Sequence, residues 1–195
     1  MKRKLIIFGL LILSSVVFLI VSQYVNTNPF RSVGNTLDSF NNVTVYYNGA
    51  VNNVEKRNVT KDGYNLGLQY QCVEFVKRYY YEYLQHKMPD SYGHAKDFFN
   101  PNVKDGNRNT QRNLIQYTNG SLSKPKVNDI LVFQASWYNS FGHVAIVMEV
   151  TEDEVIIIQQ NAGPFSNTRA TYELVQENNR WKILDNQVLG WLRKE

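Results

Sequence analysis

The sequence predicts an α+β protein in which one helix precedes an antiparallel sheet. The helix is expected over residues 71–85, where apolar side chains such as Val73, Val76 and Tyr80 recur at spacings of three and four and form one apolar face. From residue 129 onward, short apolar or alternating runs are separated by turn residues, which is typical of antiparallel strands. A helix followed by a run of strands favours the α+β class.

Most of these elements can be given bounds from the pattern alone. One isolated strand is expected early in the chain, at 43–47. The later strands are expected at 129–133, 143–150, 154–160, 171–176, 180–185 and 188–192. The loop-like stretch between helix and sheet, 87–126, is expected to hold short helices at 95–99 and 112–117.

The N-terminus carries an apolar run without a charge, from Leu5 to Val25. As a helix this run is about 30 Å long, the thickness of a bilayer's hydrocarbon core. A cleaved signal peptide is the alternative, but the run exceeds the usual apolar region of about 7–15 residues and no A-x-A-like site follows. We therefore expect a transmembrane signal-anchor.

The charges around this run predict its orientation. Lys2, Arg3 and Lys4 precede it and only Arg31 follows closely, so the positive-inside rule puts the N-terminus in the cytoplasm and the body outside. The expected organisation is a cytoplasmic basic tip (1–4), the anchor (5–25), a polar tether and lead-in (26–62) and a folded domain (63–195). The localisation expected is a single-pass membrane protein with an extracytoplasmic domain.

Charge and composition exclude several functions. The net charge is +4, and the basic tip supplies three of those charges. The body is therefore nearly neutral and has no Lys/Arg-rich run, which argues against a nucleic-acid partner. No cluster of His, Cys, Asp and Glu has metal-ligand spacing, and there is no phosphate-binding glycine loop, so neither a metal nor a cofactor is expected.

Cys72 is the only cysteine of the chain, so no intramolecular disulfide is possible. It stands at the start of the predicted helix, where unpaired N–H groups and the helix dipole favour a thiolate. A nucleophilic cysteine needs such a position near neutral pH. The alternative is a buried cysteine that packs as a small apolar residue.

His143 is the histidine best placed to act as a base for this thiol. His86 lies at the helix end beside a lysine, and His94 lies in a loop without a supporting pattern. His143 follows Gly142 at the start of the most apolar strand, and the next strand ends at Gln159–Asn161. A tight hairpin brings these strand ends together, so a carboxamide can orient the imidazole.

Four segments together resemble the CHAP family, the cysteine, histidine-dependent amidohydrolases/peptidases, and most of all the amidase half of bifunctional glutathionylspermidine synthetase/amidase enzymes. The segments are QCVEFVKRYY (71–80), FGHVAIV (141–147), QQN (159–161) and LGW (189–191). The resemblance runs from about residue 63 to the C-terminus. It implies a papain-like (CHAP/NlpC-P60 type) α+β domain, with the helix that carries the nucleophile packed on an antiparallel sheet.

The resemblance also implies roles for individual residues. Cys72 matches the nucleophile and His143 the base. Gln159 stands where the glutathionylspermidine amidases have Glu, and a neutral amide stabilises an imidazolium less than a carboxylate does; Asn161 is the alternative orienting residue. The backbone N–H of Cys72 is the natural oxyanion donor, to which Gln71 or Tyr64 adds a side chain.

Three further residues of these segments have expected structural roles. Glu74 and Arg78, four apart on the helix, are expected to form a surface ion pair worth a few tenths of a kcal/mol. Trp191 is expected in the core.

The expected activity is hydrolysis of an amide bond in a peptide or peptide-like substrate. The resemblance implies either peptide amides of the bacterial cell wall or a glutathione–polyamine conjugate, and the expected anchor favours the first. The rival hypothesis is a catalytically weak CHAP-like module that only binds, and the glutamine at position 159 keeps it open.

Overall fold

The computed structural model describes residues 2–195, without the side chains of Lys2 and Leu5. Two α-helices, α1 (Lys2–Ser22) and α2 (Cys72–Glu82), and one 3-10 turn, η1 (Ala95–Phe98), accompany the strands. The strands are β1 (Thr36–Phe40), β2 (Val43–Tyr46), β3 (Arg57–Val59), β4 (Asn65–Leu68), β5 (Asn107–Asn109), β6 (Leu114–Thr118), β7 (Ile130–Phe133), β8 (His143–Val150), β9 (Glu154–Ile158), β10 (Arg169–Glu177), β11 (Arg180–Ile183) and β12 (Val188–Arg193).

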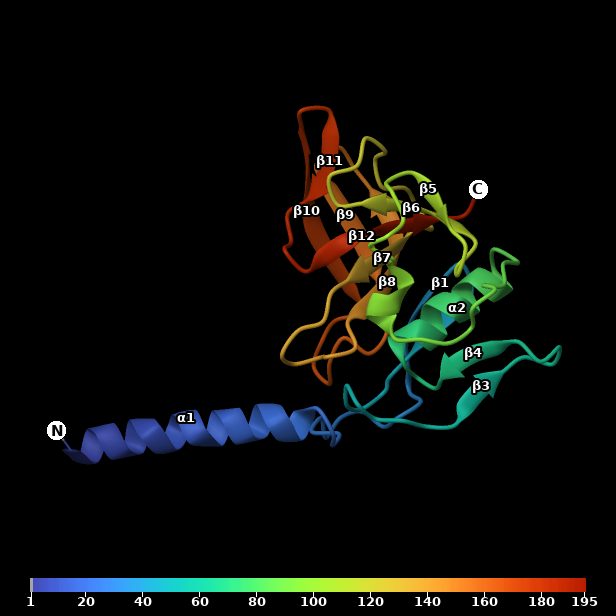
Figure 1. Cartoon of the computed structure of the whole chain (residues 1–195). Helices are drawn as coiled ribbons and strands as arrows, with labels where there is room; N and C mark the ends of the chain where they lie inside the picture. Colours follow the sequence, from blue (N-terminus) through green and yellow to red (C-terminus); the bar gives the residue numbers. More distant parts are fainter. Residues whose placement is uncertain (1) are drawn as a thin grey trace.

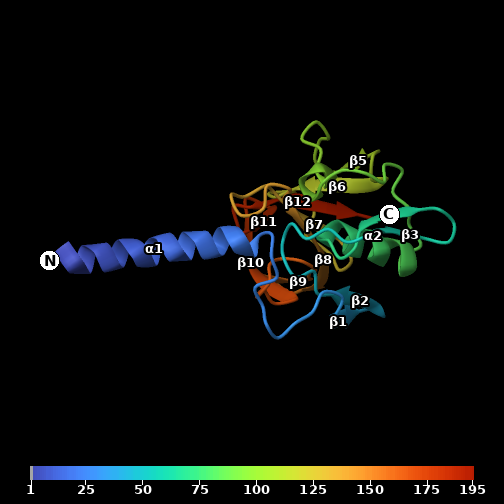
Figure 2. The same ribbon diagram turned by 90° about the horizontal axis from the view of Figure 1, so that it is seen from below.

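The principal sheet contains eight strands in the order β11-β10-β9-β8-β7-β12-β6-β5, and every named pairing within it is antiparallel. Two small hairpins, β1-β2 and β3-β4, lie near α2 (Figures 1 and 2). The predicted α+β class is therefore confirmed, and the arrangement is compatible with a papain-like fold. The predicted site residues Cys72 and His143 lie where α2 and β8 begin.

Strand β8 separates two layers of core because successive side chains point to opposite faces. Val144 and Ile146 pack in the layer that contains α2, with Phe75 and Tyr79 of that helix. The alternate residues of β8 join a second layer, in which Trp191 is fully buried as predicted. The helix is thus fixed against the sheet at the point where Cys72 meets the beginning of β8.

Helix α1 extends from the body (Figure 1). Its apolar side chains, such as Leu13, are exposed. Counted over the residues that the structure describes, no helix combines the length and the apolar character needed to cross a bilayer. This finding contradicts the transmembrane segment predicted at 5–25. The predicted single-pass localisation, which depended on that segment, is contradicted with it.

Three local predictions also need correction. The stretch 112–117, expected to be a short helix, is mostly strand β6, which pairs with β5 and β12 and whose residues 114–116 are all buried. The strands β1, β3, β4 and β5 were not predicted, since their short polar sequences carry little apolar alternation. The Glu74–Arg78 pair is buried rather than at the surface, with side chains 1% and 8% exposed.

Candidate active site

Cys72 is the first residue of α2 and lies at the base of a cleft. Gln71 precedes it in extended conformation and makes no side-chain cap, so the helix begins without a capping side chain. The thiol is 5% exposed. Backbone N–H groups of the segment around the thiol, that of Val144 most of all, favour its ionised form. The contact with Val144 places the thiol beside the start of β8, where His143 is the neighbouring residue.

Burial decides the protonation state of this thiol. Desolvation raises the pKa of Cys72 to about 11, and the backbone hydrogen bonds lower it by less than burial raises it. The helix N-terminus was expected to favour a thiolate. In this structure the neutral thiol is the resting form at pH 7, because the removal of water outweighs the N–H groups.

His143 is partly buried at the start of β8, and its two ring nitrogens have different surroundings. Nε2 lies 2.9 Å from Oε1 of Gln159. Nδ1 is buried without a hydrogen-bond partner among the described residues. Burial lowers the pKa of the imidazole to about 4, which the contact with Gln159 only partly offsets. The ring is therefore neutral at pH 7.

Gln159 fixes which nitrogen of that neutral ring carries the proton. Its amide nitrogen donates to the carbonyl of Asn167 at 3.1 Å, so the amide oxygen faces the imidazole. An amide oxygen only accepts, so Nε2 of His143 must be the protonated nitrogen. Nδ1 is then left with a free lone pair, as a proton acceptor requires.

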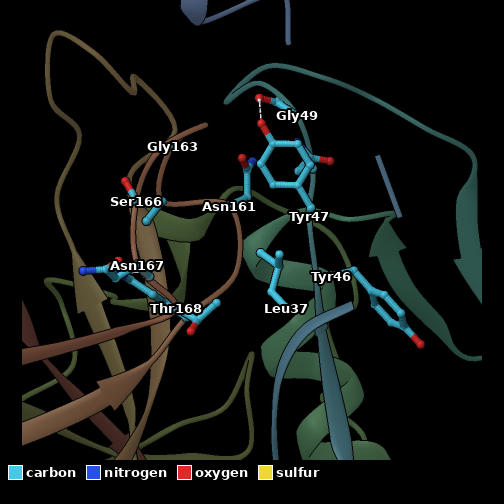
Figure 3. Close-up of a pocket in the computed structure, with 12 residues that line it drawn as sticks. Leu37, Tyr46, Tyr47, Gly49, Asn161, Gly163, Ser166, Asn167 and Thr168 are labelled. Carbon is cyan, nitrogen blue, oxygen red and sulfur yellow. Dashed lines mark hydrogen bonds between the residues drawn. The ribbon is translucent and has the colours of Figure 1, made fainter. Parts of the chain in front are cut away.

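The other predicted site residues are placed away from the imidazole. Asn161 donates to Oε1 of Gln71 at 2.8 Å and to the carbonyl of Val51 at 3.0 Å. It lies near Tyr47 in a small polar cavity that Gln159 also lines (Figure 3). The structure therefore gives the contact with His143 to Gln159 and not to Asn161.

Neither predicted side-chain oxyanion donor is available. The amide nitrogen of Gln71 lines the cleft but already donates to the carbonyls of Val51 and Asn53, at 3.2 and 2.6 Å. The hydroxyl of Tyr64 accepts from the backbone N–H of Met88, and Tyr64 is not among the residues that line the cleft. The backbone N–H at the start of α2 is the donor that remains.

A buried network that was not predicted ties this helix start to β9. Gln160 donates to the carbonyl of Gln71 and to Glu74, both at 3.0 Å. Glu74 also accepts from Asn58 at 2.8 Å and from Arg78 at 2.7 Å. The segment QQN that follows β9 thus serves two purposes: Gln159 contacts the imidazole, and Gln160 holds the start of α2. The adjacent glutamines were the available signal, but nothing in the sequence assigned the second one to the helix.

The cleft over Cys72 encloses about 580 Å³, large enough for part of a peptide. Its walls come from four segments: the residues just after α1, the approach to and end of the β3-β4 hairpin, the residues before η1, and the loop before β8. Aromatic side chains of these walls are exposed, including Tyr24, Tyr92 and Trp137. The hydroxyl of Ser22 lies 2.9 Å from that of Tyr138 and joins two of the walls.

Gly142 closes the cleft next to His143. Its φ of +75° is one that L side chains rarely adopt, and a Cβ there would meet the carbonyl of Phe133 at 2.7 Å. A glycine leaves room for a substrate to approach the imidazole. The structure adds a packing reason, because this turn must pass close to β7.

The chain is similar to several known proteins. The chain is 33% identical over 137 residues to trypanothione synthetase of Crithidia fasciculata. The matched stretch covers 65% of this chain and 21% of that protein. It is 31% identical over 142 residues to glutathionylspermidine synthase of the same organism, 65% and 19% of the two chains. This chain therefore spans about a fifth of the length of these relatives. The crystal structure of Ly7917 matches 37% of this chain and 29% of its own, at 29% identity and a TM-score of 0.28.

A family model is matched as well, and it includes both Cys72 and His143. The model of the CHAP domain matches residues 60–161, just over half of the chain. The stretch runs from the β3-β4 hairpin through α2 and β8 to the segment that follows β9. This chain belongs to the CHAP domain family.

Proposed function

We propose that the protein is a cysteine-dependent amidohydrolase or peptidase in which Cys72 is the nucleophile, His143 the base and Gln159 the orienting residue. One observation carries the proposal. A single cysteine at a helix start lies under a cleft and contacts the backbone beside a histidine whose Nδ1 is unpaired and whose Nε2 is held. Membership of an amidohydrolase/peptidase family supports the same chemistry.

At rest the thiol of Cys72 and the imidazole of His143 are both neutral, and this neutral resting pair determines how the first bond is made. As the sulfur of Cys72 attacks the substrate's carbonyl carbon, Nδ1 of His143 takes the thiol proton, so no resting thiolate is needed. The carbonyl oxygen becomes an oxyanion, which the backbone N–H of Cys72 stabilises. Gln159 accepts a hydrogen bond from the imidazolium through the amide oxygen that faces the ring.

The remaining steps return the site to its starting state. The imidazolium donates its proton to the leaving nitrogen, the C–N bond breaks, and an amine departs from a thioester on Cys72. A water molecule then gives a proton to Nδ1 and attacks the thioester. The carboxylic acid leaves, and the sulfur recovers its proton from His143.

The substrate favoured is a peptide amide of the cell-wall type rather than a polyamine conjugate. A polyamine leaving group is strongly cationic, and a site for it calls for carboxylates. None of the described residues that line the cleft is Asp or Glu. Cell-wall peptides carry carboxylates, and such a lining does not repel them.

The test is hydrolysis by the full chain of purified peptidoglycan and, separately, of glutathionylspermidine, with the products identified by mass spectrometry. New amine and carboxyl ends should arise from peptidoglycan. Cys72→Ser should abolish turnover and change the free energy of unfolding by no more than about 1 kcal/mol, because the exchange is small and at a helix end. Substantial activity in that variant would refute the thiol mechanism, and hydrolysis of glutathionylspermidine alone would refute the substrate class.

A binding module is the second candidate, and the neutral resting pair favours it. A thiol whose pKa burial raises to about 11 reacts slowly on its own. The two candidates differ in what substrate does. If the protein is an enzyme, a saturating concentration of peptidoglycan peptide should be cleaved at an amide bond. If it only binds, the peptide should protect Cys72 from iodoacetamide and remain intact, so protection without any cleavage would favour the binder.

A further inference from the structure

The cleft contains one strongly basic side chain and no acidic one among its described lining residues. Arg57, the first residue of β3, is the only Arg or Lys in that lining. It is exposed, and it makes no ion pair with any described residue. An unpaired guanidinium at the edge of a site that carries no carboxylate is a natural place for an anionic group of a ligand.

The guanidinium is held in position on two sides. Its Nη1 donates to Oδ1 of Asn65 at 3.1 Å, and its central carbon lies 5.6 Å from the centre of the Tyr92 ring. Asn65 in turn donates to the carbonyl of Ser91 at 3.1 Å. Lys77 also donates to that carbonyl at 2.8 Å, so two hydrogen bonds hold the backbone next to Tyr92. Arg57 is therefore oriented before any ligand binds.

The hairpin connects this side chain to the nucleophile. Arg57 is paired across the hairpin with Leu68, and Gly67 and Leu68 line the cleft together with Cys72. Within the described chain only one N–H of the guanidinium is bonded. Since a guanidinium has five N–H donors, enough remain for a bidentate contact with a carboxylate.

We propose that Arg57 is a specificity-determining residue that binds a carboxylate of the substrate, so that the protein selects peptides with a free carboxylate near the scissile amide. This rests on the proposed hydrolase function for its substrate. The recognition itself does not depend on catalysis, because a carboxylate-bearing reagent that enters the cleft should meet the same guanidinium.

The first test uses the single cysteine as its own reporter. The full chain is alkylated with iodoacetate, which is anionic, and with iodoacetamide, which is neutral, at equal pH and low salt. The ratio of the two rate constants cancels the thiolate fraction, which both reagents share. Arg57→Gln should lower this ratio by about threefold or more, the effect of removing one nearby charge from a partly desolvated site.

Two variants serve as matched controls. Lys56→Gln removes the same charge from the neighbouring residue, which does not line the cleft, and should leave the ratio unchanged. Arg57→Lys keeps the charge and should retain most of the preference. An unchanged ratio in Arg57→Gln, or an equal fall in Lys56→Gln, would overturn the proposal.

The second test compares hydrolysis of a peptide with a free carboxylate and of the same peptide with that carboxylate amidated. Arg57→Gln should raise KM for the free form by about tenfold and leave the amidated form nearly unaffected. An equal loss on both peptides would overturn the proposal. If neither peptide is cleaved by the unmodified chain while the alkylation ratio falls as expected, the hydrolase function fails and the carboxylate site stands.

Discussion

Gln159→Glu tests the contact on which the orientation of His143 depends. In the structure the amide oxygen faces Nε2 at 2.9 Å, and the amide nitrogen donates to the carbonyl of Asn167 at 3.1 Å. The substitution changes both contacts. It places a negative charge beside the imidazole, and it turns a second oxygen toward a carbonyl oxygen that it cannot bond.

The two effects have opposite consequences. A carboxylate at hydrogen-bond distance should raise the pKa of His143 by about 1–3 units, from about 4 toward about 5–7. The lost donor opposite Asn167 should destabilise the folded protein at pH 7 by about 1–3 kcal/mol. The substitution should therefore extend the pH range of the imidazolium while weakening the fold.

The pH dependence of stability gives the sign of the first effect. The pKa of His143 in the folded protein lies below its value of about 6.5 in the unfolded chain. Its contribution to the free energy of unfolding is therefore fully present above about pH 6.5. It is lost as the pH falls through the folded pKa, by up to about 3 kcal/mol. In Gln159→Glu this acid loss should be smaller, so the two proteins should differ less in stability near pH 5 than at pH 7.

The assay is a titration of ¹⁵N-labelled histidine by NMR, with urea denaturation at pH 7 and pH 5. The chain has three histidines, so His143→Ala assigns the signal. Gln176→Glu is the control, because it makes the same change at an exposed position of β10. If the imidazole still titrates near 4 in Gln159→Glu, or shifts equally in the control, the orientation derived from the amide is wrong.

Two further predictions follow from other parts of the structure. Deletion of residues 1–34 removes Gln23 and Tyr24 from the cleft wall. In kinetics with the peptide substrate, KM should rise several-fold with little change in kcat. Unchanged kinetics would show that this wall does not contact substrate. Glu74→Gln removes one charge of a buried ion pair and should lower the free energy of unfolding by about 3–5 kcal/mol in urea denaturation, whereas a loss below about 1 kcal/mol would mean that the pair is effectively solvated.

The elements that periodicity reveals were predicted well, and those that depend on tertiary contacts were not. Helix α2 and the later strands follow apolar spacings, and they lie close to the expected ranges. Strand β6 was expected as a helix, because its adjacent apolar residues suit either structure until pairing with β5 and β12 makes it a strand. The short strands β3 and β4 are fixed by pairing with each other and by the side chains of α2, which no local pattern records.

The candidate site shows the same division. Sequence order and a hairpin argument brought Gln159 to His143, and the structure has that contact. The charge state of Cys72 was not accessible in this way, because it depends on how completely the thiol is desolvated. The burial of Glu74 was missed for a related reason. Spacing along a helix identifies an ion pair, but the packing of the β3-β4 hairpin and the QQN segment determines whether water reaches it.

The neutral resting pair also bears on how the only thiol of the chain survives. Oxidation to sulfenic acid proceeds through the thiolate and requires access to oxidant. Burial restricts both, since Cys72 is 5% exposed and its pKa is raised to about 11. In the mechanism that we propose, reactivity is generated only when substrate is present, as Nδ1 of His143 accepts the proton during attack. The same desolvation that makes a standing thiolate unfavourable strengthens the N–H contact to a developing oxyanion, so a protected thiol and an effective transition state share one physical cause.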